Sequence, residues 1–144
     1  MLIKNKYETD CKMMPKSEYE IDFIMEKGKE KRVVKGVFKT VLAPLTIRKI
    51  VDKLPIIERG IVLDKNRLVI GVNINAAWEK ETKTVKKGDI AYQALGDELV
   101  IFFENMDETY SRVNVIGHLL NLKDIDEFLK KILMSVKVTI KLSE

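Results

Sequence analysis

The stretch GDIAYQALGDELVIFF, residues 88–103, carries the clearest structural signal in this sequence. Two apolar runs flank a Gly-Asp pair at residues 96–97, which predicts a tight antiparallel hairpin because both residue types tolerate turn conformations. The second strand of this hairpin is expected at residues 98–103, followed by a loop at 104–111. The first strand places three side chains on one face, namely Ile90, Tyr92 and Ala94.

Toward the C-terminus, the pattern continues with a strand, a helix and a last strand. Residues 112–120, RVNVIGHLL, predict a strand, and residues 136–142 alternate apolar and polar side chains as a half-buried strand does. Between them lies a helical pattern, for which Asn121 or Asp124 is the expected N-cap. The apolar stripe of that helix comprises Ile125, Phe128, Leu129 and Ile132.

Toward the N-terminus, a first hairpin is expected. Residues 19–26 alternate apolar and charged or polar side chains, which predicts a half-buried strand. Gly28 permits a tight turn after Lys27, and residues 29–39 form the returning strand. The apolar content of this returning strand comprises Val33, Val37 and Phe38.

The middle of the chain contains one helix and further strands. Pro44 fits the first turn of a helix, and Pro55 ends it. Residues 56–64 predict a short strand or an extended connection, residues 67–74 predict a strand, and residues 75–87 a long polar connection. The helix carries an apolar stripe at i, i+3, i+4 and i+7, formed by Ile47, Ile50, Val51 and Leu54.

These segments amount to about eight strands and two short helices. The expected fold class is therefore mainly β, a closed β-barrel capped by helices, because strands linked as hairpins favour closure. A chain of 144 residues is most simply one domain, and we expect the barrel at residues 18–144. Residues 1–17, rich in lysine and interrupted by Pro15, are expected to form a mobile or loosely docked tail.

The composition argues against several kinds of partner. Basic and acidic residues number 26 and 22 and are interleaved, giving a net charge of +4. Nucleic acid is not a predicted partner, because nucleic-acid surfaces concentrate basic residues. The apolar runs are too short to span a bilayer and no apolar leader opens the chain, so neither a membrane nor secretion is expected. The abundance of lysine and glutamate suits a thermophile.

Neither a metal site nor a cofactor is predicted. Cys11 is the single cysteine and His118 the single histidine, so thiolate or histidine-rich metal sites cannot be assembled. One cysteine also excludes an intramolecular disulfide, which fits a reducing, cytoplasmic location. Glycine-rich runs that cradle phosphates are missing from the sequence.

The second half of the chain resembles a known family. Its members carry a G-D-[IV]-x-Y motif and paired phenylalanines, matched here at residues 88–92 and 102–103. They also carry a strand of the form S-x-V-N-V-I-G, matched at residues 111–117. The chain thus resembles the small cyclophilin-like domains of archaea and bacteria, long labelled as of unknown function. The resemblance covers residues 19–142, most strongly in the second half, and implies a cyclophilin-like barrel.

The chain also departs from related patterns. The family often continues its paired phenylalanines with glycine and a Thr-Pro pair, where this chain has Glu104-Asn105-Met106. The family often places tryptophan where this chain has Gln93. The F-H-R-x-I and Q-G-G-D segments that true cyclophilins carry are missing, and Arg67 is the nearest substitute for their arginine. Classical prolyl isomerase chemistry is therefore not expected, and no catalytic residue is assigned.

Three polar residues of one predicted strand are candidates for a ligand site. Arg112, Asn114 and His118 are expected on one strand face, where an arginine could bind a carboxylate or phosphate through paired N–H bonds. Such a face would recognise an anion or a peptide. The competing interpretation, a solvent-facing polar row, is favoured because polar strand faces are commonly wet.

Aromatic residues are the second group of candidates. Tyr92 and Phe102, together with Trp78 and Phe103, could line an apolar pocket, although aromatic residues on strands are more often core. Trp78 differs from the others because it lies in a polar segment. It either seals a barrel mouth, which is the favoured interpretation, or marks a binding surface.

Three functions remain open at this point. The leading hypothesis is a barrel that binds a small molecule or a short peptide in a cleft, without isomerase chemistry. The alternative is a peptidyl-prolyl cis-trans isomerase with a displaced or degenerate active site. The third is a protein-interaction module that uses an exposed barrel edge or the tail, since one fold carries many functions.

Overall fold

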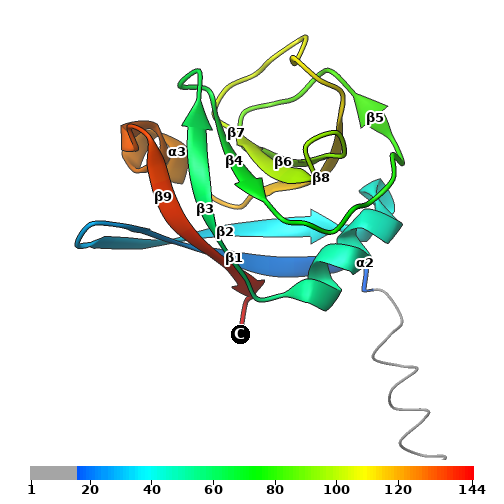
Figure 1. The fold of residues 1–144 in the computed structure, drawn as a ribbon, viewed down its shortest axis with the longest axis horizontal. Helices are drawn as coiled ribbons and strands as arrows, with labels where there is room; N and C mark the ends of the chain where they lie inside the picture. The colour runs from blue at the N-terminus through cyan, green and yellow to red at the C-terminus, as the bar shows by residue number, and fades with distance from the viewer. Residues whose placement is uncertain (1–15) are drawn as a thin grey trace, which may run out of the picture.

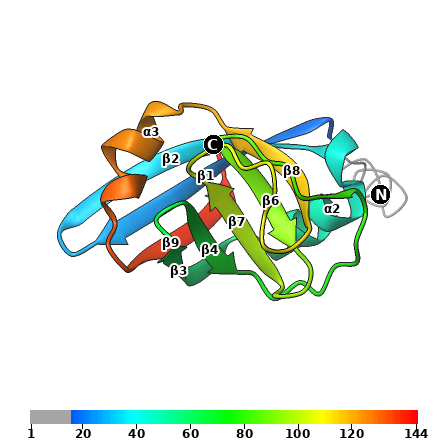
Figure 2. The ribbon, with the colours of Figure 1, turned by 90° about the horizontal axis from the view of Figure 1, so that it is seen from above.

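The computed structural model describes residues 16–144. Eight antiparallel strands close into a barrel, with one helix at each end (Figures 1 and 2). The strands are β1 (Glu18–Lys27), β2 (Glu30–Lys39), β3 (Ile56–Leu63), β4 (Arg67–Gly71), β5 (Glu81–Thr82), β6 (Asp89–Gln93), β7 (Glu98–Phe102), β8 (Val113–Leu119) and β9 (Ser135–Leu142). The helices are α2 (Pro44–Lys53) and α3 (Lys123–Glu127), with short 3-10 turns η1 (Thr40–Leu42) and η2 (Leu129–Lys131).

The sheet closes because its first and eighth members pair. The order around the ring is β2-β1-β9-β3-β4-β7-β6-β8, and β8 returns to β2. The two-residue strand β5 lies outside this ring and pairs with β8 alone. The expected closed, mainly β barrel of about eight strands with two helices is confirmed.

Gly117 permits the closure between β8 and β2. It faces Phe38 in the register of the two strands. A Cβ at position 117 would collide with the carbonyl oxygen of Val37, a backbone atom that cannot move aside. Glycine at this position therefore allows the backbones of β8 and β2 to approach each other closely.

The barrel interior is filled by apolar side chains from every strand of the ring. On β1 the expected alternation is confirmed, since its apolar face of Ile21, Phe23 and Met25 is fully buried. On β2 the predicted apolar content of Val33, Val37 and Phe38 leaves out one inward side chain. Val34 faces Phe23 and is fully buried, whereas the neighbouring Val33 is largely exposed. The partner strand decides which of two adjacent valines points inward.

Helix α2 follows the pattern that its sequence predicted. It begins at Pro44 and ends at Lys53, one residue before the Leu54-Pro55 pair. Ile47 and Ile50 are buried against the barrel interior. The opposite face of the helix points away from the core.

Helix α3 lies at the other end of the barrel (Figure 2). Neither expected residue is the N-cap, which is Leu122 and has no side-chain cap bond. Asn121 lies one residue earlier, where its Oδ1 accepts a hydrogen bond from the Lys123 N–H at 3.0 Å. Asp124 lies inside the helix instead and pairs with Arg32 of β2 at 3.0 Å. The helical segment closes this end with buried apolar residues, namely Ile125, Phe128, Leu129 and Ile132.

Two predicted boundaries shift in the structure. Residues 56–64 resolve into strand β3, and the strand expected at 67–74 ends at Gly71. Residues 75–87 form the expected long connection and include only the short strand β5. The predicted N-terminal tail falls largely on residues 1–15, which lie outside the described part. Among residues 16–144, the helices are all too short or too polar to cross a lipid bilayer.

Candidate functional site

Two of the five candidate ligand residues come together in the barrel. Tyr92 of β6 and Asn114 of β8 face each other in the strand register, and both are fully buried. Their side chains share the face of the sheet that lines the interior, because Tyr92 belongs to the main core cluster.

His118 lies on the other face of the sheet, which corrects one expectation. The register of β6 and β8 shifts between Ile90 and Ala91, so that β8 contains one extra residue at this point. Such a bulge reverses the inward and outward alternation beyond it. His118 therefore faces Asp89, whose pKa is raised by burial, and does not continue the face of Asn114.

Phe102 and Arg112 are also separate from the Tyr92 and Asn114 pair. Phe102 belongs to a smaller apolar cluster with Val69 and Val100, distinct from the core that contains Tyr92. Arg112 lies just before β8, largely exposed, and forms an ion pair with Glu81 at 3.2 Å. The five residues do not line one common cleft, and ligand binding by any of them stays a prediction.

The mouth of the barrel beside α2 is crossed by a segment that we call the strap, residues 73–80. It runs from the end of β4 toward β5 and passes beside α2 (Figure 1). Asn73 and Asn75 adopt positive φ angles of 53° and 51°. Asparagine tolerates this conformation better than most residues, which explains how the strap turns twice without glycine.

The first half of the strap is fixed by Asp97. Its Oδ1 accepts hydrogen bonds from the N–H groups of Ile74 and Asn75, both at 3.0 Å. The Tyr92 hydroxyl donates to the same oxygen at 2.7 Å and accepts from the Ala76 N–H at 3.1 Å. Burial would raise the pKa of Asp97, but these hydrogen bonds outweigh it and hold the pKa below its ordinary value.

Tyr92 remains a neutral donor in this arrangement. Burial, followed by the bond to the Asp97 carboxylate, raises the pKa of Tyr92 to about 12. The phenol therefore keeps its proton throughout the physiological range and continues to tie the strap to the barrel wall.

The second half of the strap is fixed at two more points. Glu79 Oε1 accepts hydrogen bonds from the backbone N–H and the hydroxyl of Thr46, at 2.6 and 2.9 Å. Glu79 thereby satisfies a free N–H in the first turn of α2. The Lys80 N–H donates to Asn114 Oδ1 at 2.9 Å. Asn114 Nδ2, also buried, has no hydrogen-bond partner among the described residues.

A groove of about 360 Å³ lies between the strap and α2. The helix contributes one face with the spacing i, i+3, i+4 and i+7, and the strap contributes four consecutive residues. Trp78 and Leu45 keep 45% and 69% of their surface exposed, so the groove offers apolar surface to a ligand. The groove is lined by Leu45, Arg48, Lys49, Asp52, Ala76, Ala77, Trp78 and Glu79.

The charged groups at this groove differ in how firmly they are held. Lys49 Nζ donates to the carbonyl of Asn75 at 3.1 Å, and Glu79 is held by Thr46 as described above. Arg48 and Asp52 approach only to 4.0 Å on the outer side of α2. Arg48 is thus the cation of the groove whose contact is the weakest.

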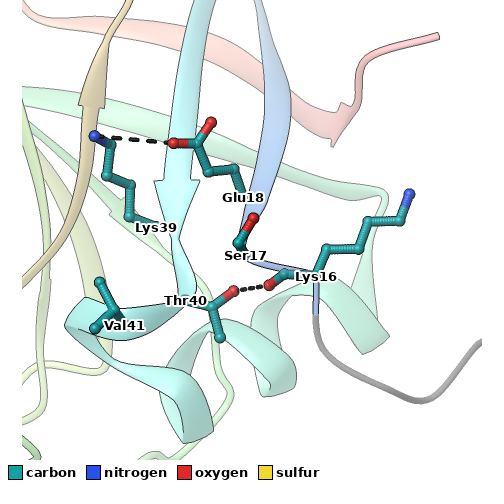
Figure 3. A pocket seen from close by; sticks show the side chains of 6 residues that line it. All are labelled: Lys16, Ser17, Glu18, Lys39, Thr40 and Val41. Carbon is teal, nitrogen blue, oxygen red and sulfur yellow. Dashed lines mark hydrogen bonds and ion pairs between the residues drawn. The ribbon is translucent and has the colours of Figure 1, made fainter.

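A second hollow of about 500 Å³ lies where β1 begins and β2 ends. Figure 3 shows its lining, in which Lys39 faces Glu18 at 3.9 Å and the Thr40 hydroxyl donates to the Lys16 carbonyl. In this hollow Lys39 and Glu18 are beyond hydrogen-bond distance, as Arg48 and Asp52 are beside α2, so both sites hold a weakly paired cation. The groove beside α2 is the stronger candidate because it adds an exposed indole.

Sequence reasoning missed most of the groove. Trp78 was singled out as either a seal or a binding surface, and the structure places it in the groove wall. The helical residues Leu45, Arg48 and Asp52 were not considered. The available signal was the exposed leucine on the polar side of a helix whose apolar stripe was already assigned.

Comparison with protein-family models matches residues 20–141 to the family described as cyclophilin-like. Among solved structures, the solution structure of the hypothetical protein AF2241 from Archaeoglobus fulgidus is similar, with a TM-score of 0.70. The two sequences are 22% identical, and the match covers 90% of this chain and 98% of that one. At this identity the likeness supports the fold alone. The comparison with curated proteins gives no match.

Proposed function

The chain belongs to the cyclophilin-like family, and we propose that it binds a small molecule or a short peptide in the groove between α2 and the strap. The observation that carries this proposal is an exposed tryptophan on a wall that is fixed by hydrogen bonds at Asp97, Tyr92, Thr46 and Asn114. A preorganised wall lowers the entropic cost of binding. The groove volume also falls within the range of small-molecule sites.

Two of the ligand residues predicted from the sequence hold the wall of this groove in place. Tyr92 and Asn114 bond to the strap on either side of Trp78, at Ala76 and Lys80. They act as positioning residues for the groove wall. Phe102, Arg112 and His118 face elsewhere, and their part in any binding stays a separate hypothesis.

Trp78 also supplies the test, because it is the single tryptophan of the chain. We expect its indole N–H signal in a ¹⁵N-correlated NMR spectrum to shift when metabolites or proline peptides that raise the melting temperature are added. Replacing Trp78 with alanine should abolish the thermal response. The matched control is Leu133→Ala, which removes a large exposed apolar side chain away from the groove.

A broad library that yields no thermal response and no indole shift would refute groove binding. Responses confined to amide signals near Arg112 or His118 would place a site on β8 instead. Because each region has its own signals, the experiment separates the two outcomes.

The isomerase alternative has one specific observation in its favour. Arg67 faces Phe102 in the strand register, and its guanidinium lies 5.0 Å from the Tyr110 ring centroid. An arginine beside aromatic surface is the kind of group that could hold a twisted peptide bond. However, Arg67 also contacts Asp64 and Asn66, at 3.2 and 2.9 Å.

A protease-coupled assay on an Ala-Pro peptide tests this alternative. Rate enhancement that disappears in Arg67→Ala or Arg112→Ala would support an isomerase with a displaced site. An isomerisation rate equal to that of the peptide without the protein would refute the isomerase alternative.

A further inference from the structure

We infer that the groove selects a small aromatic carboxylate, with Trp78 against the aromatic ring and Arg48 paired with the carboxylate. This inference rests on the proposed function and narrows the ligand class of the same site. It follows from the shape of the groove walls and from the way its charges are already used.

The apolar part of the groove favours a flat ring. Ala76 and Ala77 leave room beside the strap because their side chains are small, and Trp78 and Leu45 stand exposed around that space. An aromatic ring stacks well on an indole, and such a contact contributes beyond the area that it buries. A planar ligand would cover both exposed side chains at once.

The charges of the groove favour an anionic group on that ring. The Glu79 carboxylate is turned toward the N-terminus of α2, where it is stabilised by two donors from Thr46 and by the helix dipole. Lys49 is tied to the carbonyl of Asn75. Glu79 cannot exchange its partners without leaving the Thr46 N–H unpaired, whereas Lys49 would have to give up a hydrogen bond at the surface.

Arg48 differs from both because, among residues 16–144, its one charged contact is weak. The guanidinium and the Asp52 carboxylate are 4.0 Å apart, beyond hydrogen-bond distance, and both side chains are exposed. Ion pairs of this kind contribute little to stability. Arg48 can therefore turn from Asp52 to a ligand carboxylate, with which it forms two parallel hydrogen bonds.

The size of the groove favours a small molecule over a peptide. Its volume of about 360 Å³ lies near the lower end of the range for small-molecule sites. A single ring system with a short acid side chain fits this space. A peptide of several residues would extend over the exposed outer face of α2.

Matched acids and amides test the inference. Phenylacetate, indole-3-acetate and 2-naphthoate should shift the indole N–H signal of Trp78, whereas the corresponding neutral amides should bind at least about tenfold more weakly. Replacing Arg48 with glutamine should weaken binding of the acids about tenfold and leave the amides unchanged. Arg59→Gln, an exposed arginine on β3, is the matched control and should change neither.

Four outcomes overturn the inference. Equal binding of acids and amides removes the charge selectivity and leaves groove binding intact. Acid binding that persists in Arg48→Gln excludes Arg48 as the partner of the carboxylate and points to Lys49, the other cation of the groove. A response to acetyl-Gly-Gly-Phe with a free C-terminus, but to none of the small acids, assigns the groove to a peptide. No indole shift with any of these probes also refutes it, and the broad library described above then decides separately whether the groove binds anything.

Discussion

The two ends of the barrel are each covered by a helix but use their charged residues in opposite ways. At the α3 end, Arg32 bonds to Asp124 at 3.0 Å and to Glu127 at 2.7 Å. Its guanidinium also lies 5.9 Å from the centroid of the Phe128 ring. At the α2 end, the outer helical face leaves Leu45 exposed and Arg48 weakly paired.

This difference separates stability from binding. The α3 end is closed by buried apolar residues, and the Arg32 ion pairs connect β2 to the helix. The α2 end is held through the strap, whose bonds fix a groove but do not fill it. We therefore expect substitutions at α3 to change mainly the free energy of unfolding, and substitutions on the open side of α2 to change mainly ligand binding.

The largest expected loss of stability comes from Asp124→Ala. The Asp124 side chain is only 10% exposed, and its removal deprives Arg32 of its more buried partner. Since Arg32 is itself partly exposed, we expect the free energy of unfolding to fall by about 2 kcal/mol, less than for a fully buried pair. Denaturant unfolding measures this change.

The matched control is Asp126→Ala, on the same helix. Asp126 is exposed and pairs with Lys87 and Lys130 at the surface. Its removal should leave the free energy of unfolding nearly unchanged, because exposed ion pairs contribute little. Equal losses for the two variants would contradict the special role given to the Arg32 pair, and altered ligand binding in Asp124→Ala would contradict the separation of the two ends.

Tyr92→Phe should have the next largest effect. The substitution removes one hydroxyl, leaving the buried N–H of Ala76 unpaired and depriving Asp97 of a donor. We expect a loss of about 1–2 kcal/mol in the free energy of unfolding, together with weaker ligand binding because the strap is less firmly held. Tyr110→Phe, at an exposed tyrosine, should leave both quantities nearly unchanged; a similar loss there would show that the strap bonds are unimportant.

The hydrogen bonds of Asp97 should make the free energy of unfolding depend on pH, with an effect smaller than that of Tyr92→Phe. Because the folded-state pKa of Asp97 lies below its ordinary value near 3.8, the ionised group stabilises the fold. This contribution is complete above about pH 5 and is lost as the pH falls through the folded pKa. The difference in unfolding free energy between the parent protein and Asp97→Asn should thus be about 1 kcal/mol near neutral pH and shrink below about pH 4.

The pKa of Asp22 also lies below its ordinary value, so Asp22 and Asp97 lose their stabilising charge over the same range of pH. Comparison with Asp97→Asn is therefore needed to isolate the contribution of Asp97. Burial would raise the pKa of Asp22, but bonds from Ser143 and Lys35 hold it below the ordinary value. The parent protein alone therefore cannot identify the responsible group. A difference between the two proteins that stays constant from pH 7 to pH 3 would exclude Asp97 as its source.

Most of the fold was predictable because it depends on local patterns. Alternation on β1, the glycine turns and the proline boundaries of α2 all act over a few residues. The extra residue near Ile116 was not predictable from alternation, since a strict period of two assumes an unbroken ladder. That single residue is the reason why His118 was expected on the face of Asn114 and lies on the opposite one.

The groove was harder to predict than the barrel. It arises where Glu79 of the strap bonds to Thr46 of α2, two residues far apart in the sequence. Helical periodicity shows which face of α2 is buried but not what stands beside the other face. Trp78 was the one groove residue that its polar surroundings brought to notice.

Trp78→Ala should change stability least and binding most. Its side chain is nearly half exposed and the bonds that fix the strap run through neighbouring residues, so the free energy of unfolding should change by less than about 0.5 kcal/mol. Ligand affinity should nevertheless fall at least about tenfold, because the stacking surface is lost. Trp78→Phe, which keeps an aromatic face, should restore part of that affinity. If Trp78→Ala instead lowered stability as much as Tyr92→Phe does, Trp78 would be a structural seal of the barrel mouth. Both ends of the barrel would then contribute mainly to stability, and the α2 end would not be a binding site.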